Sequence, residues 1–499
     1  MLKNIFITIL LICSVSGVWG QKSVKVKVSG NVITTDGVPA EFINIQLKNT
    51  FYGGTSDGKG YFEFMAPAGQ YTMIVQSIAA HRREFPVTIE EGKENHFADI
   101  EIRENINQLE QVVVTGQFSP QSMRNSLYKV RTVNSEQIRQ KAPTSVQSLL
   151  NTEIGIRLSN DMALGETDFE LMGMSGNNVK ILLDGIPLID RGATKQSLSQ
   201  LDVNSIERVE IVEGPMSVVY GTDALAGVIN IITKKGDGYS EENTWRVGAR
   251  VQEESMGKEY DFFKDKGLHN ESIDLGFNHK SGLFVNGGYT RNNHGGWQGD
   301  LTGREKRWHP KDQALMNGMF GFQNRNMNVW YRLDFLDEKI FGPNNGSELQ
   351  PEKVSDKDFL TKRYTHQLQS DWKLDNRLDV HAALSYQDYK RRTRTTESDL
   401  STGEKWLSSA EASQDITQYK AWIARATVAW NIAPEFSVQP GVEYQWTQGE
   451  GGRIDGTPKV SDLAFFLSAE YKPWEWLSLR PGVRTFIVAD YDAPIAIPS

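Results

Sequence analysis

The chain of 499 residues has 39% hydrophobic residues, a mean hydropathy of −0.45 and a formal net charge of −9 at pH 7. This length allows more than one domain, and the negative charge argues against a nucleic-acid-binding protein. The low mean hydropathy suits a soluble protein but does not exclude a membrane β-barrel, because barrel strands alternate between apolar and polar residues.

The first predicted element is a secretory signal peptide over residues 1–20. Lys3 precedes a short apolar run from Ile5 to Val15, and small residues follow that run. The run is too short to span a bilayer, and its basic start and small-residue end are typical of an export signal. The single cysteine, Cys13, lies within it, so we expect neither disulfides nor thiol catalysis in the mature chain.

Residues 22–103 are predicted to form a small β-sandwich. Val26 and Val28 alternate with lysines, and further short strands follow at regular spacing between turn signals. The sequence Thr-Ser-Asp-Gly-Lys-Gly-Tyr-Phe at 55–62, followed by Ala-Gly-Gln-Tyr-Thr at 68–72, resembles the carboxypeptidase-regulatory-like domain. The histidines of this region lack a cluster of metal ligands, so we expect no catalytic metal in it.

A β-branched run follows at residues 109–116, Leu-Glu-Gln-Val-Val-Val-Thr-Gly. It has two interpretations. It could be the last strand of the sandwich, or it could be a flexible strand that adds to the edge of a partner's sheet through main-chain hydrogen bonds.

Residues 117–236 are predicted to form an α+β unit. Near its end, residues 206–234 contain two apolar runs around a turn-rich centre. Gly214-Pro215 stops the first run, and Ser217 to Tyr220 fits one helical turn with Ser217 as a possible N-cap. The run from Val228 to Thr233 is mostly apolar on both faces, which predicts a buried strand.

From residue 237 to residue 499 the pattern changes to a two-residue alternation. Between Met327 and Phe335, for example, apolar residues alternate with a face that contains Asn328, Arg332 and Asp334. A soluble sandwich would also alternate, but here short turns and long loops alternate as well, which is typical of outer-membrane barrels. About eleven strands can be placed.

The amino-acid sequence of residues 206–234 strongly resembles the end of the plug domain of TonB-dependent outer-membrane receptors. The similar stretch is Val-Glu-Gly-Pro-x-Ser-x-x-Tyr-Gly, followed by Gly-Val-Ile-Asn-Ile-Ile-Thr-Lys. A second stretch, ending in Asp-Gly-Ile-Pro, matches the family's Asp-Gly-x-Pro signature, whereas Met172 stands where the family usually has an arginine. The resemblance implies structural roles in the plug for Asp184, Gly185, Pro187, Glu213, Gly214, Pro215, Tyr220, Gly221, Gly227 and Asn230.

The resemblance also implies the fold. It is mainly β, with an N-terminal β-sandwich, an α+β plug domain over 117–236 and an antiparallel transmembrane β-barrel. A plugged transporter lumen calls for about 22 strands, so residues 237–499 would supply the first half, and we expect a C-terminally truncated fragment. In receptors of the Bacteroidetes type, the sandwich precedes a TonB box, which here would comprise Glu110, Gln111, Val112, Val113, Val114, Thr115 and Gly116.

The function that this resemblance implies is active transport across the outer membrane of a Gram-negative bacterium, with the sandwich in the periplasm. TonB and its inner-membrane complex, outer-membrane lipid and a small-molecule ligand are the expected partners. A ferric siderophore is the first ligand expected, and cobalamin, haem or another large solute are the alternatives. Four residues of one long loop are candidate ligand contacts: His294, Trp297, Trp308 and His309.

Other classes of function remain at this point. A barrel could anchor a surface binding or adhesion module, or form a passive porin, although neither needs a coupling strand and a plug. We expect no enzyme, because Asp184 and Glu213 have no nucleophile or positioned base beside them. We also expect no cofactor and no resident metal.

Overall fold

The computed structural model describes residues 25–34, 39–77, 80–102, 112–116, 121–122, 128–160, 167–190, 196–221, 223–236, 242–433, 435–452, 454, 456–474, 476–488 and 496–498. The chain forms two compact units that divide between Val112 and Val113, with Ser122–Arg124 assigned to the first unit. Among the described residues, no helix combines the length and the apolar character needed to cross a membrane.

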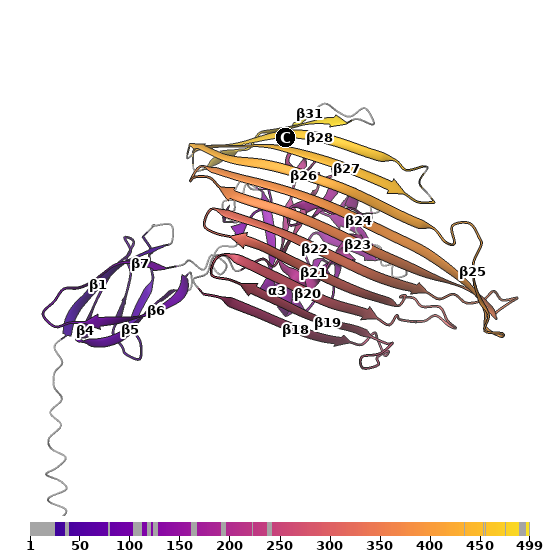
Figure 1. The fold of residues 1–499 in the computed structure, drawn as a ribbon, viewed down its shortest axis with the longest axis horizontal. Coiled ribbons are helices and arrows are strands. Elements are labelled where there is room, and N and C mark those ends of the chain that lie inside the picture. Colours follow the sequence, from indigo (N-terminus) through magenta and orange to yellow (C-terminus); the bar gives the residue numbers. More distant parts are fainter. Residues whose placement is uncertain are drawn as a thin grey trace, which may run out of the picture. The chain divides into compact units, whose positions relative to one another are not determined.

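The first unit is a sandwich of two β-sheets, drawn in indigo and violet in Figure 1. Its core contains side chains from both sheets, among them Val28, Ile45, Phe62 and Val75. One sheet has the order β4-β1-β7, and the other has the order β3-β2-β5-β6. The strands are β1 (Lys25–Thr34), β2 (Asn44–Leu47), β3 (Gly53–Thr55), β4 (Tyr61–Pro67), β5 (Gly69–Ser77), β6 (Ala80–Ile89) and β7 (Asn95–Ile102).

The second unit begins with the plug, a mixed five-stranded sheet with short helices. The order of its strands is β10-β16-β17-β14-β15, and a second sheet has the order β11-β12-β13. The strands are β10 (Lys129–Asn134), β11 (Ile156–Asn160), β12 (Thr167–Leu171), β13 (Met174–Ser175), β14 (Val179–Leu183), β15 (Ile186–Pro187), β16 (Ile206–Glu213) and β17 (Gly227–Thr233). The helices are α3 (Ser135–Lys141), α4 (Val146–Leu150), α5 (Ser217–Tyr220) and the 3-10 turns η2 (Gly176–Asn178), η3 (Gln196–Ser199) and η4 (Val203–Ser205).

Local sequence explains most of these plug elements. Every residue of β17 is buried, as its apolar run predicts, because β17 lies between β16 and β14 in the sheet. Asn134 caps α3, with Gln137 completing a capping box. The helical turn predicted at Ser217–Tyr220 is present, but its N-cap is Met216. The N-cap prediction for Ser217 is therefore wrong by one residue, since Ser217 is already helical.

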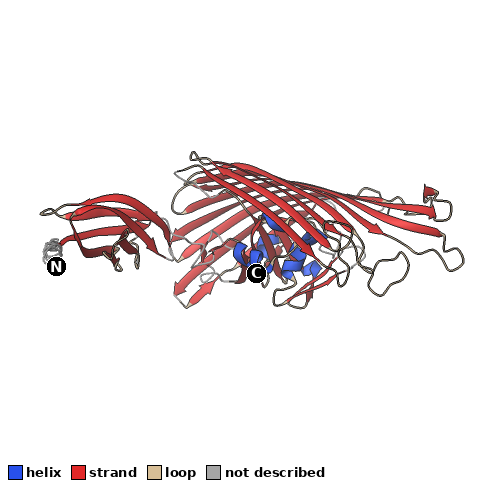
Figure 2. Ribbon diagram, turned by 90° about the horizontal axis from the view of Figure 1, so that it is seen from below, coloured by secondary structure: helices blue, strands red, loops and turns tan. Residues whose placement is uncertain are grey.

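A large antiparallel sheet follows the plug and curves around it, so that the plug helices lie on its concave side (Figures 1 and 2). It has fourteen strands, of which β25 and β29 lie off the main path. The strands are β18 (Thr244–Glu254), β19 (Leu268–Asn278), β20 (Leu283–His294), β21 (Lys311–Gln323), β22 (Met327–Gly342), β23 (Lys353–Lys373), β24 (Leu378–Asp399), β25 (Lys405–Leu407), β26 (Ile416–Ala433), β27 (Phe436–Glu450), β28 (Lys459–Trp474), β29 (Leu477–Leu479), β30 (Gly482–Val488) and β31 (Ala496–Pro498).

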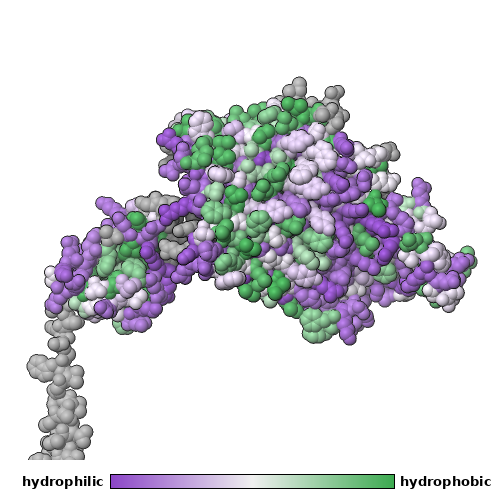
Figure 3. All heavy atoms as spheres, in the orientation of Figure 1, coloured by the Kyte–Doolittle hydropathy of each residue, from purple (hydrophilic) through white to green (hydrophobic). Residues whose placement is uncertain are grey.

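The two faces of this sheet differ as the alternation predicts. On β22, Trp330 and Arg332 are buried on the concave face, and an Arg332 guanidinium nitrogen donates to the Ser205 hydroxyl of the plug at 3.2 Å. The convex face carries exposed apolar side chains, including Trp245, Val285 and Leu368. Figure 3 shows a hydrophobic band across the strands, with hydrophilic atoms toward the long loops.

The predicted fold class is thus confirmed: the chain is mainly β, with an α+β plug and an antiparallel, barrel-like sheet. The large sheet holds more strands than the eleven expected, because the short strands β25, β29 and β31 are too brief to show a two-residue alternation.

The first prediction concerns Gly227, at the start of β17. A Cβ atom there would lie 2.1 Å from the Val212 carbonyl oxygen, and the φ of Gly227 is +150°. We expect Gly227→Ala to destabilise the plug by about 2 kcal/mol, through overpacking and backbone strain. Pulse proteolysis of the full-length protein in urea would measure this change. The control is Gly318→Ala, because a Cβ at Gly318 meets nothing within 4 Å. Equal midpoints for the two variants would contradict the prediction.

Candidate functional site

The residues that follow β8 (Val112–Val113) are held against the plug by hydrogen bonds. The backbone N–H groups of Val114 and Thr115 donate to the carboxylate oxygen Oε2 of Glu210 at 3.1 and 2.8 Å. The Thr115 hydroxyl donates to the same oxygen at 2.6 Å. Thr115 is 1% exposed and Glu210 is fully buried, so water has little access to these bonds.

The position of Glu210 follows from the plug sheet. It lies on β16 directly opposite Asn230 of β17, and both side chains are on the same face of the sheet. The Asn230 amide donates to the Thr115 hydroxyl at 2.9 Å and accepts from the Gly185 N–H at 2.9 Å. Glu210 also accepts from the Arg208 guanidinium at 2.9 Å. The carboxylate is therefore fully partnered despite its burial.

Gly116 ends this docked stretch next to α5. Its N–H donates to the Tyr220 hydroxyl at 3.3 Å. Its φ is +70°, and a Cβ atom there would lie 2.4 Å from the terminal methyl of Met216, so a larger residue would be strained and would displace the Met216 side chain. Burial raises the pKa of the Tyr220 hydroxyl above its ordinary value.

The run 109–116 contains both described and undescribed positions. Glu110 and Gln111 lie outside the described residues, whereas Val112 and Val113 form β8. In the described part of the chain β8 belongs to a two-stranded sheet with β9 (Gln121–Ser122), separate from the sheets of the sandwich. The described part of this run, Val112–Val113, thus pairs with β9 and not with a strand of the sandwich, and both interpretations of the whole run stay predictions.

The two plug carboxylates of the motif are both paired within the plug. Asp184 accepts from the Thr233 N–H at 3.0 Å and from the Thr233 hydroxyl at 2.7 Å, and it lies 3.6 Å from the Lys235 ammonium. Glu213 accepts from Lys129 at 2.6 Å and from Arg131 at 2.9 Å. These contacts support structural roles for both.

Several motif glycines occupy backbone conformations that L-residues rarely adopt. The φ angles are +85° at Gly185, +107° at Gly214 and +88° at Gly221. Pro187 is buried in β15, and Pro215 lies between Gly214 and α5. These residues shape the turns that bring β14, β16 and α5 together.

The plug also hydrogen-bonds to glutamine side chains of the surrounding sheet. Plug carbonyl groups of Asp184, Pro187 and Ser199 accept from the amides of Gln369, Gln387 and Gln313, at 2.8, 2.7 and 2.9 Å. At these three points the large sheet therefore contacts the plug through uncharged amide donors.

One charged cluster of the sheet holds α5. Glu443 of β27 is 3% exposed and accepts from Arg425 at 2.9 Å and from Arg484 at 2.6 Å. The Arg425 guanidinium lies 5.0 Å from the centre of the Tyr220 ring, and Arg484 donates to the Val219 carbonyl at 3.3 Å. Sequence reasoning missed this cluster, because its members lie on three different strands.

The position where the family usually has an arginine lies outside this cluster. Met172 stands there, and its side chain is 55% exposed. A methionine cannot form the internal salt bridge that an arginine at this position could make.

A polar cavity of about 630 Å³ lies on the concave face at the long-loop end of the sheet. Its lining includes charged and hydroxyl side chains from β23, β24, β26 and the neighbouring loops, such as Lys306, Lys357, Arg391, Asp415 and Thr417. Among the described residues, no carboxylate forms an ion pair with Lys306 or Lys357. These two ammonium groups are available to a polar or charged solute.

The four predicted ligand contacts do not all lie at the polar cavity. His309 lines the polar cavity. The His294 and Trp308 rings pack together with their centres 3.9 Å apart, and Trp297 and Trp308 exchange backbone hydrogen bonds of 2.8 and 3.0 Å. Among the described residues, no group of three His, Cys, Asp or Glu side chains could hold a metal ion. A ligand role for these four residues stays a prediction.

Comparison with known proteins finds two matching families. The TonB-dependent Receptor Plug Domain matches residues 122–228, and the CarboxypepD_reg-like domain matches residues 28–114. The vitamin B12 transporter BtuB of Vibrio vulnificus (strain CMCP6) is 32% identical over 139 residues, which is 28% of this chain and 23% of that protein. The chain thus aligns with about a quarter of the length of this curated relative.

Two solved structures have similar folds. The ferric enterobactin receptor PfeA of Pseudomonas aeruginosa, solved as a point mutant, aligns over 78% of this chain and 60% of its own, with a TM-score of 0.55 and 15% identity. The P. aeruginosa protein FpvA, solved bound to a pyoverdine-iron complex, aligns over 80% of this chain and 59% of its own, with a TM-score of 0.55 and 13% identity. These similarities concern the fold.

The second prediction concerns the docked stretch. Glu210→Ala removes three hydrogen bonds to Val114 and Thr115, each worth about 1 kcal/mol. We expect the stretch to open on the order of 100-fold more often. The measurement is the rate at which a water-soluble maleimide labels Val113→Cys, since the only native cysteine is Cys13.

Two further variants make this measurement specific. Glu207→Ala, on the same strand but less buried, should leave the labelling rate unchanged. Thr115→Val, which keeps both backbone donors, should raise it less than Glu210→Ala. Equal rates for Glu210→Ala and Glu207→Ala would contradict the prediction.

Proposed function

Because this chain belongs to the TonB-dependent receptor family, whose members are not enzymes, we propose that it is part of an active transporter of the bacterial outer membrane. In this proposal the large sheet belongs to a barrel in the membrane, and the plug closes the barrel lumen. The sandwich lies in the periplasm, and residues 1–20 direct export. The exposed apolar band on the convex face of the sheet supports the membrane placement.

The observation that carries this proposal is the attachment of Val114–Gly116 to the centre of the plug. We propose that the TonB box comprises residues 109–116 and that TonB adds a strand to it, pulling on its backbone. Force on the box would reach Glu210 on β16 through three short hydrogen bonds. Because β16 pairs with both β10 and β17, this force would act on the plug sheet itself.

The proposed solute is a ferric siderophore. The polar cavity of about 630 Å³ is lined by the cationic Lys306, Lys357 and Arg391 and by the acidic Glu305, Glu411 and Asp415, and its size and polarity suit part of a polar chelate. The solved structures of similar fold include a ferric enterobactin receptor and a protein bound to a pyoverdine–iron complex. Vitamin B12 is the second candidate, because the curated relative is a vitamin B12 transporter. Haem or another large solute is the third candidate under the same mechanism.

A surface binding or adhesion protein anchored by the barrel is the rival class. The two classes differ in energy use, because an adhesion protein needs no proton-motive force. Cells that express the full-length receptor would be given radiolabelled ferric enterobactin or cyanocobalamin. Accumulation that stops when the proton-motive force is collapsed would support transport, whereas binding without accumulation of any tested solute would support adhesion.

The third prediction tests the coupling segment. Val113→Pro removes a backbone N–H and fixes φ, and both changes oppose strand addition. We expect uptake to be abolished while solute binding at the cell surface persists. Val113→Ala keeps the N–H and should retain uptake. Normal uptake by Val113→Pro would refute the assignment of this segment.

The fourth prediction tests which face of β22 meets lipid. Val329, Tyr331 and Leu333 lie on the convex face, whereas Asn328 and Arg332 lie on the concave face. Arginine at a lipid-facing midplane position costs about 2–4 kcal/mol, while lumen positions are more tolerant. Val329→Arg should therefore reduce assembly in outer membranes sharply, and Asn328→Arg should not. Heat-modifiable mobility on gels would measure assembly, and equal assembly of both variants would contradict the membrane placement.

A further inference from the structure

A strip of polar side chains continues from the polar cavity along the concave face of β23 and β24. Tyr389 of β24 is two residues from Arg391, which lines the cavity. From there, concave positions of the two strands lie side by side in register toward the opposite end of the sheet. We call six of these residues the polar strip: Thr365, Gln367 and Gln369 of β23, and Ser385, Gln387 and Tyr389 of β24. All six are uncharged, and each is at most 3% exposed.

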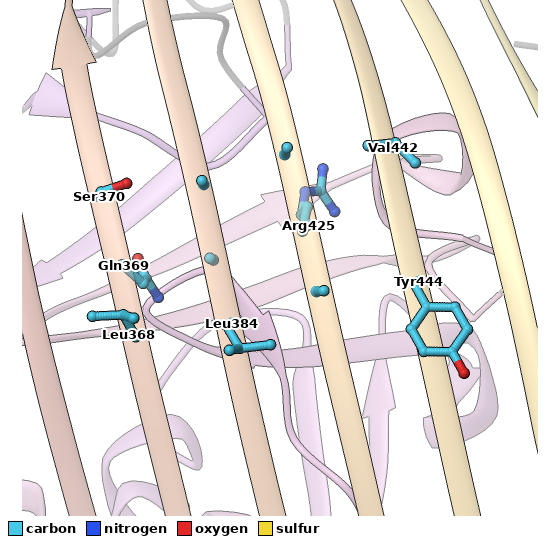
Figure 4. A pocket seen from close by; sticks show the side chains of 11 residues that line it. Leu368, Gln369, Ser370, Leu384, Arg425, Val442 and Tyr444 are labelled. Atoms are coloured by element: carbon cyan, nitrogen blue, oxygen red, sulfur yellow. The ribbon is translucent and has the colours of Figure 1, made fainter.

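The strip belongs to the face of the sheet that meets the plug. Figure 4 views β23 and β24 from the convex side, where Leu368 and Leu384 stand on the near side of the strands and Gln369 lies on the far side. Gln369 is buried there against the plug. The two-residue alternation therefore gives these strands an apolar convex face and a polar concave face.

The neighbouring strands present different side chains beside the strip. On β26, the buried Ala421 and Ile423 lie directly opposite two residues of the strip. On β22, the neighbours are Arg332 and Asp334, which pair with each other at 2.6 Å. A neutral surface that can donate and accept hydrogen bonds is thus bounded by apolar side chains on one side and by a closed ion pair on the other.

The strip holds one segment of the plug through hydrogen bonds between uncharged groups. The acceptors lie between Leu183 at the end of β14 and Gln196 at the start of η3. The bonds run from Gln367 to the Leu183 carbonyl at 3.3 Å, from Gln369 to the Asp184 carbonyl at 2.8 Å, from Gln387 to the Pro187 carbonyl at 2.7 Å and from the Tyr389 hydroxyl to the Gln196 side-chain oxygen at 3.1 Å. Hydrogen bonds between uncharged groups are individually weak, so this segment can separate from the strip in small steps.

Two buried hydroxyl groups at the strip have no hydrogen-bond partner among the described residues. They belong to Ser385, in the strip itself, and to Thr361, which lies opposite Arg391 at the cavity. Buried polar groups are normally hydrogen-bonded. Both hydroxyls would gain a partner if water or a polar solute entered between the strip and the plug.

The plug is held differently further along the sheet, at α5. The buried Arg425 guanidinium lies 5.0 Å from the centre of the Tyr220 ring. Val218 packs so closely against β30 that a Cβ atom at Gly482 would lie 2.9 Å from the Val218 Cγ1 atom. A buried guanidinium over an aromatic ring is held more strongly than a hydrogen bond between neutral groups, so we expect α5 to stay in place when the strip separates from the plug.

We propose that the solute passes between the plug and the polar strip, while α5 stays against β28 and β30. The proposal rests on the proposed function, since it needs a plug that moves inside a barrel. The plug segment between Leu183 and Gln196 would move away from β23 and β24, and the amides and hydroxyls of the strip would then bind the solute. Because the strip carries no charge, it suits a solute with hydroxyl, amide or carbonyl groups and would hold it too weakly to stop its passage.

Two matched crosslinks test which side of the plug must move. Ile186 of β15 packs against Ala383 of β24, so a disulfide in Ile186→Cys/Ala383→Cys would fix the plug to the strip. A disulfide in Val218→Cys/Gly482→Cys would fix α5 to β30. The only native cysteine is Cys13, and gel mobility would show that each crosslink has formed.

Uptake would be measured with radiolabelled ferric enterobactin and cyanocobalamin, in cells that express the full-length receptor, before and after reduction. Oxidised Ile186→Cys/Ala383→Cys should take up at least about tenfold less solute than its reduced form, because the disulfide prevents the strip from separating. Oxidised Val218→Cys/Gly482→Cys should take up as much solute as its reduced form.

A second measurement needs no disulfide. Ser385→Cys in the strip and Ser468→Cys on β28 replace serines that are 1% and 4% exposed, and Ser468 lies directly opposite Gly482. In cells given either solute, a water-soluble maleimide should label Ser385→Cys at least about tenfold faster than Ser468→Cys, because only the strip opens. Collapse of the proton-motive force should slow the labelling of Ser385→Cys.

Three results would overturn the proposed route. They are undiminished uptake by the crosslinked Ile186→Cys/Ala383→Cys receptor, an equal loss of uptake with either crosslink, and equal labelling of the two cysteines. In each case, energy-dependent uptake by the unaltered receptor would leave the proposed function intact. Binding without uptake of either solute by the unaltered receptor would refute the proposed function, and the route with it.

Discussion

The buried carboxylate of Glu210 is the interaction on which the arrangement of the second unit depends. An unpaired carboxylate in this position would cost several kcal/mol, and the cost is offset only because donors surround it. Two of those donors are the backbone N–H groups of Val114 and Thr115. The carboxylate and the docked segment therefore satisfy each other, and removing either weakens the hydrogen bonding of the other.

A second buried carboxylate, Glu443, acts on α5 from the surrounding sheet. It holds Arg425 and Arg484 in place, and these two guanidinium groups contact the Tyr220 ring and the Val219 carbonyl. Tyr220 in turn accepts from the Gly116 N–H. The short helix α5 thus connects the charged cluster in the sheet to the segment that Glu210 binds, so the two carboxylates act on one continuous set of contacts.

Local sequence was enough to predict several parts of the fold. The two-residue period of β22 predicted its two faces, and the apolar run of β17 predicted its burial. The Glu210–Thr115 contact was not predictable from the sequence, because 95 residues separate the two partners. Nothing in the sequence around either residue distinguishes it from an ordinary polar side chain. The same reason explains the missed Glu443 cluster. The sequence could not show which of the four loop side chains pack together, and in the structure His294 and Trp308 pack on each other while His309 lines the cavity.

The glutamine amides that face the plug have a consequence for how the plug can move. Gln313, Gln369 and Gln387 each donate one uncharged hydrogen bond to a plug carbonyl. A water molecule can replace such a bond at little net cost, whereas separating a buried ion pair would strand a charge. These contacts can therefore be exchanged for water one at a time as the plug shifts. At these points the interface between the plug and the large sheet therefore resists displacement of the plug only weakly, and its hydrogen bonds can form again when the plug returns.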